Sequence, residues 1–294
     1  MFMKEVLVIG GSGFVGSHTC DSLSESGYKV TIFDKFKSQW IKKDQKMIIG
    51  DMMDEASLRA AMNNKDYVFH FGGIADIEEA DKKPFETINF NVLGVTKALM
   101  ACKEAGVKRF FYGSTIYVFS PYGSIYRASK QASETIIEAF SEKFNLKYTF
   151  LRYGSLYGPR AQIWNGLQNR VETIVNKKKI IYHGTGLEER EYIHIKDAAN
   201  MTVDALSDKY INQAVTLTGS QVISSKALIE MIFEIANIKP NIKFKNIDLK
   251  NTKHYTKTPY RYTPKKSKKI SPNEYIDFGQ GLLEVIEAAY KKKN

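Results

Sequence analysis

The sequence predicts an α/β protein: a doubly wound parallel sheet followed by a smaller lobe. Short β-rich runs alternate with helical patterns through the first half of the chain, which is typical of parallel sheets covered by helices on both faces. The composition supports an ordinary globular protein, because 43% of the 294 residues are hydrophobic and 26% are charged. The longest apolar runs, such as Val6–Ile9, are too short to span a membrane, and we expect no membrane partner.

The expected elements follow one another in a regular order. Strands are expected at Glu5–Ile9, Lys29–Phe33, Met47–Ile49, Tyr67–Phe71, Arg109–Tyr112 and Lys147–Leu151. Helices are expected from Gly13 and at Glu55–Met62, Phe85–Ala105, Ser124–Phe144, Gly166–Val175, Lys196–Ser207, Ser224–Ile235 and Leu282–Lys291. The alternation loosens after Gly158. We therefore expect a first domain over residues 1–158, with parts of 190–218, and a partly discontinuous C-terminal substrate lobe over 159–294.

A glycine-rich loop directly follows the first expected strand. Its glycines have the spacing Gly-x-x-Gly-x-x-Gly: Gly10, Gly13 and Gly16. Phe14 and Val15 start the apolar side of the next helix. A dinucleotide pyrophosphate needs backbone N–H groups at close range, and glycines together with a helix N-terminus supply them. The motif alone also fits an ordinary turn, but its place between a strand and a helix favours a Rossmann-like coenzyme domain.

The end of the second strand bears on the choice between NAD and NADP. Asp34 lies eighteen residues after Gly16, near the spacing at which a carboxylate binds the adenosine ribose hydroxyls. Such a carboxylate repels a 2′-phosphate, so we expect NAD. Two features leave alternatives open: Lys35 and Lys37 would suit a phosphate, and Asp34 also fits a plain strand-end turn.

The candidate redox centre combines two short segments. Tyr126 and Lys130 lie four residues apart on an expected helix and so share a face. A phenol has an ordinary pKa of about 10, and an ammonium and a positive nicotinamide ring nearby favour its phenolate form. Ser114 and Thr115 follow the fifth strand, where ligands of open α/β sheets bind. Either segment alone fits a surface pair or a turn cap; after the coenzyme loop, both favour hydride transfer.

The remaining composition gives few functional signals. The net charge of +11 fits either an anionic ligand or solvated lysine runs; without interleaved aromatics, we expect no nucleic-acid partner. Cys20 and Cys102 fall in expected helices, and no secretory signal is seen, which predicts a reduced, cytoplasmic protein. The histidines show no metal-ligand spacing and are interpreted as structural or surface residues: His70, His183, His194 and His254.

Taken in order, these motifs resemble the extended short-chain dehydrogenase/reductase superfamily, in particular its NAD-dependent nucleotide-sugar epimerase/dehydratase family. The resemblance covers nearly the whole chain and implies a catalytic set of Thr115, Tyr126 and Lys130, with Lys130 also at the coenzyme. The further coenzyme residues that it implies are Asp51, Met52, Phe71, Gly72 and Gly73. The substrate residues that it implies are Asn91, Thr115, Ser155, Arg160 and Arg190.

The resemblance also assigns roles to larger features. Arg190 matches the arginine that clamps the nucleotide diphosphate, a task that suits a planar guanidinium. Relatives often pair the helices corresponding to Phe85–Ala105 and Ser124–Phe144 into a four-helix interface, which implies a homodimer.

The sequence departs from the family pattern in several places. Residues 119–126 form a shorter segment than usual, and Ser155 stands where many members have Asn. Ile116 and Tyr117 replace the Asp-Glu pair of sugar 4,6-dehydratases. The cysteine of 3,5-epimerase-reductases and the glutamate of decarboxylating relatives are also missing from the sequence near Thr115.

We therefore expect NAD-dependent epimerisation of a nucleotide-diphosphate sugar at C4 through a transient 4-keto sugar. Two alternatives share the same residues. One is an NAD(P)H-dependent reductase or dehydrogenase of a nucleotide-linked keto sugar. The other is a non-catalytic NAD-binding sensor.

Overall fold

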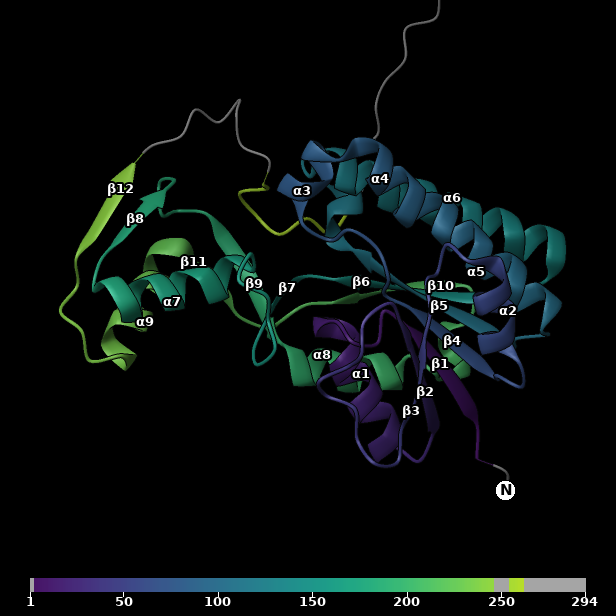
Figure 1. Cartoon of the computed structure of the whole chain (residues 1–294). Coiled ribbons are helices and arrows are strands. Elements are labelled where there is room, and N and C mark those ends of the chain that lie inside the picture. Colours follow the sequence, from purple (N-terminus) through teal and green to yellow (C-terminus); the bar gives the residue numbers. More distant parts are fainter. Residues whose placement is uncertain (1–2, 246–253, 262–294) are drawn as a thin grey trace, which may run out of the picture. The chain divides into compact units, whose positions relative to one another are not determined.

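The central element is a parallel sheet of seven strands (Figure 1). The structure is a computed structural model that describes residues 3–245 and 254–261, so the predicted helix at Leu282–Lys291 lies outside the described residues. In spatial order the strands are β10 (Gln213–Leu217), β6 (Lys147–Tyr153), β5 (Arg109–Thr115), β4 (Tyr67–His70), β1 (Glu5–Ile9), β2 (Lys29–Asp34) and β3 (Lys46–Ile49). The strand order runs outward in opposite senses on the two sides of the neighbours β1 and β4. Open α/β sheets bind ligands at such a switch point, outside the carboxyl ends of the strands.

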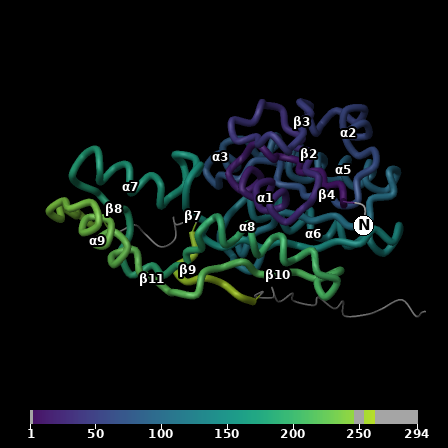
Figure 2. Tube along the Cα trace, turned by 90° about the horizontal axis from the view of Figure 1, so that it is seen from below, coloured from purple at the N-terminus to yellow at the C-terminus, as the bar shows by residue number. Residues whose placement is uncertain are grey.

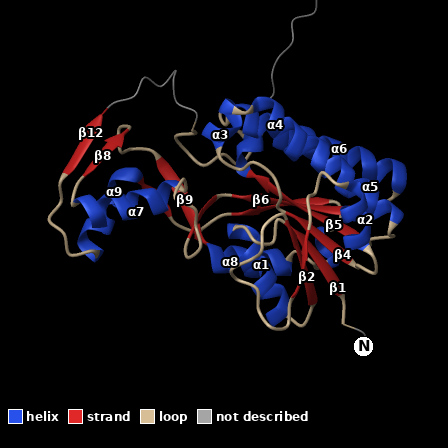
Figure 3. Ribbon diagram, in the orientation of Figure 1, coloured by secondary structure: helices blue, strands red, loops and turns tan. Residues whose placement is uncertain are grey.

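Helices cover both faces of this sheet, as a doubly wound fold requires (Figure 3). One face carries α1 (Phe14–Glu25) and α8 (Ile195–Asp204), which contact each other. The other carries α2 (Glu55–Met62), α5 (Gly94–Glu104) and α6 (Ser124–Phe144). Each predicted strand of the first half is present. β5 runs to Thr115, three residues beyond its predicted end, which places Thr115 inside the strand.

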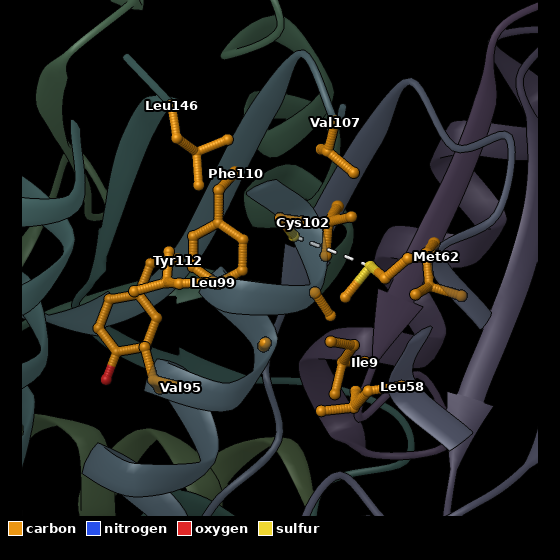
Figure 4. Close-up of a cluster of buried hydrophobic side chains, with 14 of the residues drawn as sticks. Ile9, Leu58, Met62, Val95, Leu99, Cys102, Val107, Phe110, Tyr112 and Leu146 are labelled. Atoms are coloured by element: carbon orange, nitrogen blue, oxygen red, sulfur yellow. Dashed lines mark hydrogen bonds between the residues drawn. The ribbon is translucent and has the colours of Figure 1, made fainter. Parts of the chain in front are cut away.

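Two apolar clusters fill the layers on either side of the sheet. Figure 4 shows the layer under α2 and α5, where Leu58, Leu99 and Phe110 belong to one cluster of buried apolar side chains and Leu58 lies beside Ile9. In this layer Cys102 Sγ lies 3.8 Å from Met62 Sδ. Cys20 belongs to the cluster on the opposite face. Both cysteines are buried free thiols, as their place in amphipathic helices predicted.

The predicted helix over Phe85–Ala105 is interrupted by a turn of π-helix. It consists of α4 (Pro84–Ile88), the π-turn Asn89–Leu93 and α5. A π-turn widens the helix locally and often marks a functional site. Here it contains Asn91, whose side chain is buried. The preceding α3 (Ile77–Lys82), which the sequence analysis missed, is capped by the Asp76 carboxylate accepting from Glu79 N at 2.7 Å.

A smaller group of elements follows β6. It comprises β7 (Ser155–Tyr157), α7 (Gly166–Lys177), β8 (Ile180–His183), β9 (Glu189–His194), β11 (Val222–Ser224), α9 (Ser225–Ile235) and β12 (Ile242–Lys245). These form a three-stranded sheet, β11-β9-β7, and a β12-β8 pair. α7 and α9 pack together over a separate apolar cluster (Figure 2). Between β9 and β11 the chain returns to the large sheet as α8 and β10.

The described part of the chain contains neither a membrane-spanning helix nor a cluster of metal-binding side chains. Over residues 3–245 and 254–261, no helix is long and apolar enough to cross a membrane. The same residues contain no group of three or more His, Cys, Asp or Glu side chains that could hold a metal ion.

Candidate active site

The loop from Gly10 to Gly16, here called the coenzyme loop, packs its backbone against the end of β4. A Cβ on Gly10, whose φ is +76°, would lie 2.6 Å from Gly72 N. A Cβ on Gly16 would lie 2.2 Å from Gly10 O. No side chain caps the N-terminus of α1, which Gly13 precedes. The first-turn N–H groups of α1 and the glycine-lined backbone therefore fit the pyrophosphate of a dinucleotide.

Asp34 organises the loops at the end of β2. Its carboxylate accepts hydrogen bonds from Ser12 N at 3.0 Å and from Phe36 N at 3.2 Å. Lys35, which the sequence left as a possible partner for a 2′-phosphate, instead pairs with Asp51 at 3.2 Å. Among the residues that the structure describes, no lysine pairs with the half-buried Asp34 carboxylate, which lies at the position expected for the ribose and agrees with NAD.

Asp51 and Met52 lie next to the coenzyme loop on the β3–α2 connection. Asp51 accepts a hydrogen bond from Met53 N at 2.9 Å, and this bond is the main reason that the pKa of Asp51 is lowered. A Cβ on Gly72 would lie 2.8 Å from Met52 Sδ. Met52 and Gly72 therefore touch, and the predicted coenzyme residues of both segments come together.

Asn91 is fixed by its neighbours. Its Oδ1 accepts from Ile74 N at 2.7 Å, and its Nδ2 donates to Ile74 O at 2.9 Å and to Ser129 Oγ at 3.0 Å. A Cβ on Gly73 would lie 2.4 Å from the same Oδ1, which explains a glycine there. The π-turn points this amide inward, so that it ties the loop after β4 to α6. These bonds give Asn91 a positioning role in the site, and its predicted substrate contact stays a prediction.

Thr115, Tyr126 and Lys130 meet at the carboxyl end of β5. Lys130, on α6, is buried and donates to Gly113 O at 2.8 Å. Its Nζ lies 5.9 Å from the centre of the Tyr126 ring. Thr115 is also buried, and it lies close enough to the Tyr126 hydroxyl to lower the pKa of that group. The structure therefore brings the three predicted catalytic side chains together.

The pKa values of this set differ from the sequence expectation. Burial raises the pKa of Tyr126 to about 12, against the opposing hydrogen bond from Thr115. Burial lowers the pKa of Lys130 to about 8, against the opposing charge of Glu134. Desolvation thus outweighs the effect of the Thr115 hydroxyl and keeps the pKa of Tyr126 above the neutral range. A positive coenzyme ring would be needed to favour its phenolate.

A buried ionic network that the sequence analysis missed supports this set. Glu134, one helical turn beyond Lys130, accepts from Ser114 Oγ at 2.6 Å. It also accepts from Arg152 of β6, at 3.0 Å from Nε and 2.6 Å from Nη2. The network joins the ends of β5 and β6 to α6. The four-residue spacing Tyr126–Lys130–Glu134 was the available signal, since it puts all three on one helix face.

A second group beside Tyr126 comes from distant parts of the chain. The Tyr117 hydroxyl hydrogen-bonds with His254 Nδ1 at 2.6 Å. The Tyr117 ring lies 4.7 Å from that of Tyr255, and the Arg190 guanidinium lies 4.3 Å from the same Tyr255 ring. Ser155 Oγ hydrogen-bonds with the Tyr255 hydroxyl at 3.3 Å. The predicted substrate residues Arg190 and Ser155 are therefore brought together around Tyr255, a residue that no sequence motif indicated.

Arg160 has other partners. Its guanidinium donates to Asp21 of α1 at 2.8 Å and stacks over Trp40 at 4.7 Å. The adjacent Pro159 O hydrogen-bonds with His18 Nε2 at 2.9 Å. The Asp21 carboxylate and the Trp40 ring engage this guanidinium, while its buried Nη1 has no hydrogen-bond partner among the described residues. The substrate contact of Arg160 therefore stays a prediction.

Comparison with known proteins agrees with this geometry. Residues 6–215 match the NAD dependent epimerase/dehydratase family. The chain is 27% identical to dTDP-D-glucose 4,6-dehydratase of Mus musculus, over 79% of this chain and 74% of the mouse protein. It is 26% identical to UDP-glucose 4-epimerase of Rhizobium leguminosarum bv. trifolii, over 80% of this chain and 83% of that protein.

A solved structure shows the same fold. It is UDP-N-acetylglucosamine 4-epimerase from Methanobrevibacter ruminantium M1, in complex with UDP-N-acetylmuramic acid. The TM-score is 0.78 and the identity 25%, over 90% of this chain and 91% of that one.

Proposed function

Because the chain belongs to the NAD dependent epimerase/dehydratase family, we propose that it binds NAD and interconverts C4 epimers of a nucleotide-diphosphate sugar. One observation carries the proposal. The Thr115–Tyr126–Lys130 set lies at the carboxyl end of β5, while the positions directly after Thr115 are occupied by Ile116 and Tyr117. The site thus has the groups for moving a hydride and a proton at one carbon, without carboxylates at 116 and 117 for an elimination.

NAD fits the residues present. The coenzyme loop and the N-terminus of α1 would hold the pyrophosphate, and Asp34 the adenosine ribose. Lys130, beside Tyr126, would hydrogen-bond the nicotinamide ribose. When bound, oxidised NAD supplies a hydride acceptor and a positive charge, the charge that Tyr126 needs to ionise.

Each side chain has a separate role at the sugar. Tyr126, as phenolate, takes the proton of the 4-hydroxyl while hydride leaves C4, and Thr115 hydrogen-bonds the same oxygen. Arg190 keeps the diphosphate bound while the 4-keto sugar turns its other face toward the returning hydride. Tyr126 then gives the proton back. The sum is an isomerisation that consumes no coenzyme.

The relatives include both a dehydratase and epimerases, so the reaction needs a chemical argument. Loss of water from a 4-keto hexose requires a base that takes the C5 proton and an acid that protonates the leaving 6-hydroxyl. Ile116 is a buried apolar residue, and the Tyr117 hydroxyl is engaged by His254. This pair favours epimerisation over dehydration.

The testing experiment is NMR of the purified protein incubated with a panel of nucleotide sugars and no added coenzyme. We expect a new 4-epimer, with retained NAD as the only redox partner, and no product from Tyr126→Phe, which should still hold NAD. Turnover that requires stoichiometric NADH or NADPH would support the reductase alternative instead. A 6-deoxy-4-keto product would show that the dehydratase relative is the better guide. Firm NAD binding without turnover on any sugar would support the sensor.

We also propose that the protein is a homodimer through α4, α5 and α6. Phe85 is 90% exposed, Ile88 46% and Leu93 45%, all on the α4–α5 segment. Exposed apolar side chains along one helical segment are typical of an interface. Light scattering should give a dimer, and Phe85→Glu should shift it toward monomer without changing the circular dichroism.

Finally, we propose a reducing, cytoplasmic location. Cys20 and Cys102 are free thiols on opposite faces of the large sheet, which is ordinary for a protein kept reduced. Fractionation of cells with a compartment-specific marker tests this.

A further inference from the structure

A row of side chains joins the two ends of the proposed substrate site. It runs from Tyr126, where the proton is exchanged, through Tyr117 and Tyr255 to Arg190. The Tyr126 and Tyr117 rings meet edge to face with centres 6.3 Å apart. The Tyr117 and Tyr255 rings are 4.7 Å apart, and Arg190 stacks 4.3 Å from the Tyr255 ring. We call Tyr117 and Tyr255 together the aromatic wall.

The aromatic wall is held in place from several sides. Tyr117 lies in the turn that follows β5, and its hydroxyl is bound to His254. A Cβ on Gly123 would lie 2.7 Å from Tyr117 Cδ1, so the N-terminal cap of α6 packs directly on the ring. Tyr255 is only 4% exposed, with its hydroxyl on Ser155. A ring with this many contacts has little freedom to leave the site.

The segment that carries Tyr255 is anchored on the strand that carries Arg190. Glu189 N donates to Thr256 O at 2.8 Å, and Glu191 N donates to Thr258 Oγ1 at 3.3 Å. These bonds hold residues 254–258 along β9. Hydrogen bonds to β9 therefore hold Tyr255 of the aromatic wall next to Arg190, the proposed diphosphate clamp, although more than sixty residues separate the two in the sequence.

We propose that the aromatic wall lines the hexose-binding part of the site and selects an uncharged hexose over a hexuronic acid. The proposal rests on the proposed function. In a nucleotide-diphosphate hexose, the ring lies between the diphosphate and the reacting C4, so a substrate held by Arg190 and reacting at Tyr126 has its hexose along the wall. Aromatic faces pack well on the C–H faces of a sugar, whereas a buried carboxylate needs a cation of its own, and in the proposal the diphosphate already occupies Arg190.

The charged groups around the wall agree with this selection. Burial lowers the pKa of His254 below its ordinary value, which disfavours a positive charge on this side chain. Asp76 and Glu78, at the N-terminus of α3, act on His254 with negative charge, and Arg190 and Arg170 with positive charge. Arg190 is the proposed diphosphate clamp. Arg170 donates to Tyr192 at 3.3 Å and stacks over Tyr182. In the proposal the diphosphate occupies Arg190, and the Arg170 guanidinium is held against Tyr192 and Tyr182, while the carboxylates of Asp76 and Glu78 would repel a uronate.

The first test compares UDP-glucose with UDP-glucuronic acid on the protein with NAD bound. We expect the wild type to have a kcat/KM at least tenfold higher for UDP-glucose. Tyr117→Ala should lower this value roughly tenfold through loss of ring packing, and should lower the value for UDP-glucuronic acid much less. Tyr117→Phe keeps the ring and should keep most of the selectivity. Tyr210→Ala, at a tyrosine of the turn before β10, is the matched control and should leave the ratio of the two values unchanged.

A binding measurement separates this proposal from the proposed function. Saturation-transfer NMR on the wild type should show contact with the hexose protons of UDP-glucose. Tyr117→Ala should weaken these signals relative to those of the uridine. If they weaken but the wild type turns over no sugar, the wall stands and the epimerase assignment fails. If epimerisation occurs but Tyr117→Ala leaves both the hexose signals and the selectivity unchanged, the wall is wrong and the assignment stands. Equal use of both sugars by the wild type also overturns the wall's selectivity.

Discussion

The buried pair of Glu134 and Arg152 gives a prediction whose size follows from the structure. Glu134→Gln keeps the shape of the side chain but removes its charge, leaving the Arg152 guanidinium without a counter-ion. The two side chains are only 10% and 18% exposed. Removing one partner of a buried pair costs about 3–5 kcal/mol, and the partial exposure of Arg152 places the expected loss near about 3 kcal/mol.

Thermal unfolding provides the assay. For a chain of this size, about 3 kcal/mol corresponds to a fall in Tm of roughly 6–12 °C. Glu138→Gln is the matched control, one helical turn further along α6. The pKa of Glu138 is raised, first by burial and then by repulsion from Glu134. Removing that repulsion should leave Tm unchanged or slightly higher.

The pairing itself is tested by adding Arg152→Met. The double variant Glu134→Gln/Arg152→Met has no uncompensated guanidinium and should be more stable than Glu134→Gln alone. If Glu134→Gln and Glu138→Gln unfold within about 1 °C of each other, which is within the scatter expected of surface substitutions, the reasoning from burial and pairing is refuted. The reasoning is also refuted if the loss of stability in the double variant equals the sum of the losses in Glu134→Gln and in Arg152→Met.

Three further predictions concern the coenzyme loop and the catalytic set. Gly16→Ala should abolish retention of NAD, because its Cβ would lie 2.2 Å from Gly10 O. Gly166→Ala is the control, since its Cβ would meet nothing closer than 3.7 Å. The NAD released on denaturation is measured for both variants. Tyr126 should show no tyrosinate absorbance below about pH 10 without coenzyme, since burial raises its pKa to about 12. Oxidised NAD should move this titration to lower pH, as read from wild type minus Tyr126→Phe, and an unchanged curve would contradict the role given to the coenzyme charge. Lys130 has a pKa lowered to about 8 from 10.5, so between these values the folded state has lost a proton that the unfolded state keeps. Stability from this group therefore rises with pH; in urea unfolding the wild type should gain on Lys130→Met between pH 8 and 10, and a constant difference would exclude a lowered pKa.

The sequence by itself determined the features that depend on short segments. The strands of the first half and the coenzyme loop were predicted because alternation, glycine spacing and helix periodicity act within a few residues. The Tyr126–Lys130 pair was predicted for the same reason, as a helix places residues four apart on one face.

Other features were decided only by the tertiary structure. In the π-turn, the Asn91 side chain hydrogen-bonds both with the loop after β4 and with α6. Local helix propensity does not predict these contacts, because both partners are distant in the sequence. The pKa of Tyr126 is raised by burial within the whole fold, which the sequence around Tyr126 does not show. Arg160 matched a substrate motif by its position in the sequence, and only the folded chain shows that its guanidinium pairs with Asp21.

The aromatic wall shows the division most clearly. Tyr117 stood in the sequence only as a departure from the dehydratase pattern, and His254 as an ordinary histidine. Nothing within a few residues of either links it to Arg190 or Tyr255. Their contact exists because β9 holds the segment 254–258 beside the turn that follows β5. The sequence determined which chemistry this protein carries, since motifs are local; the packing of distant segments decided which side chains surround it, since such contacts form only when the chain is folded.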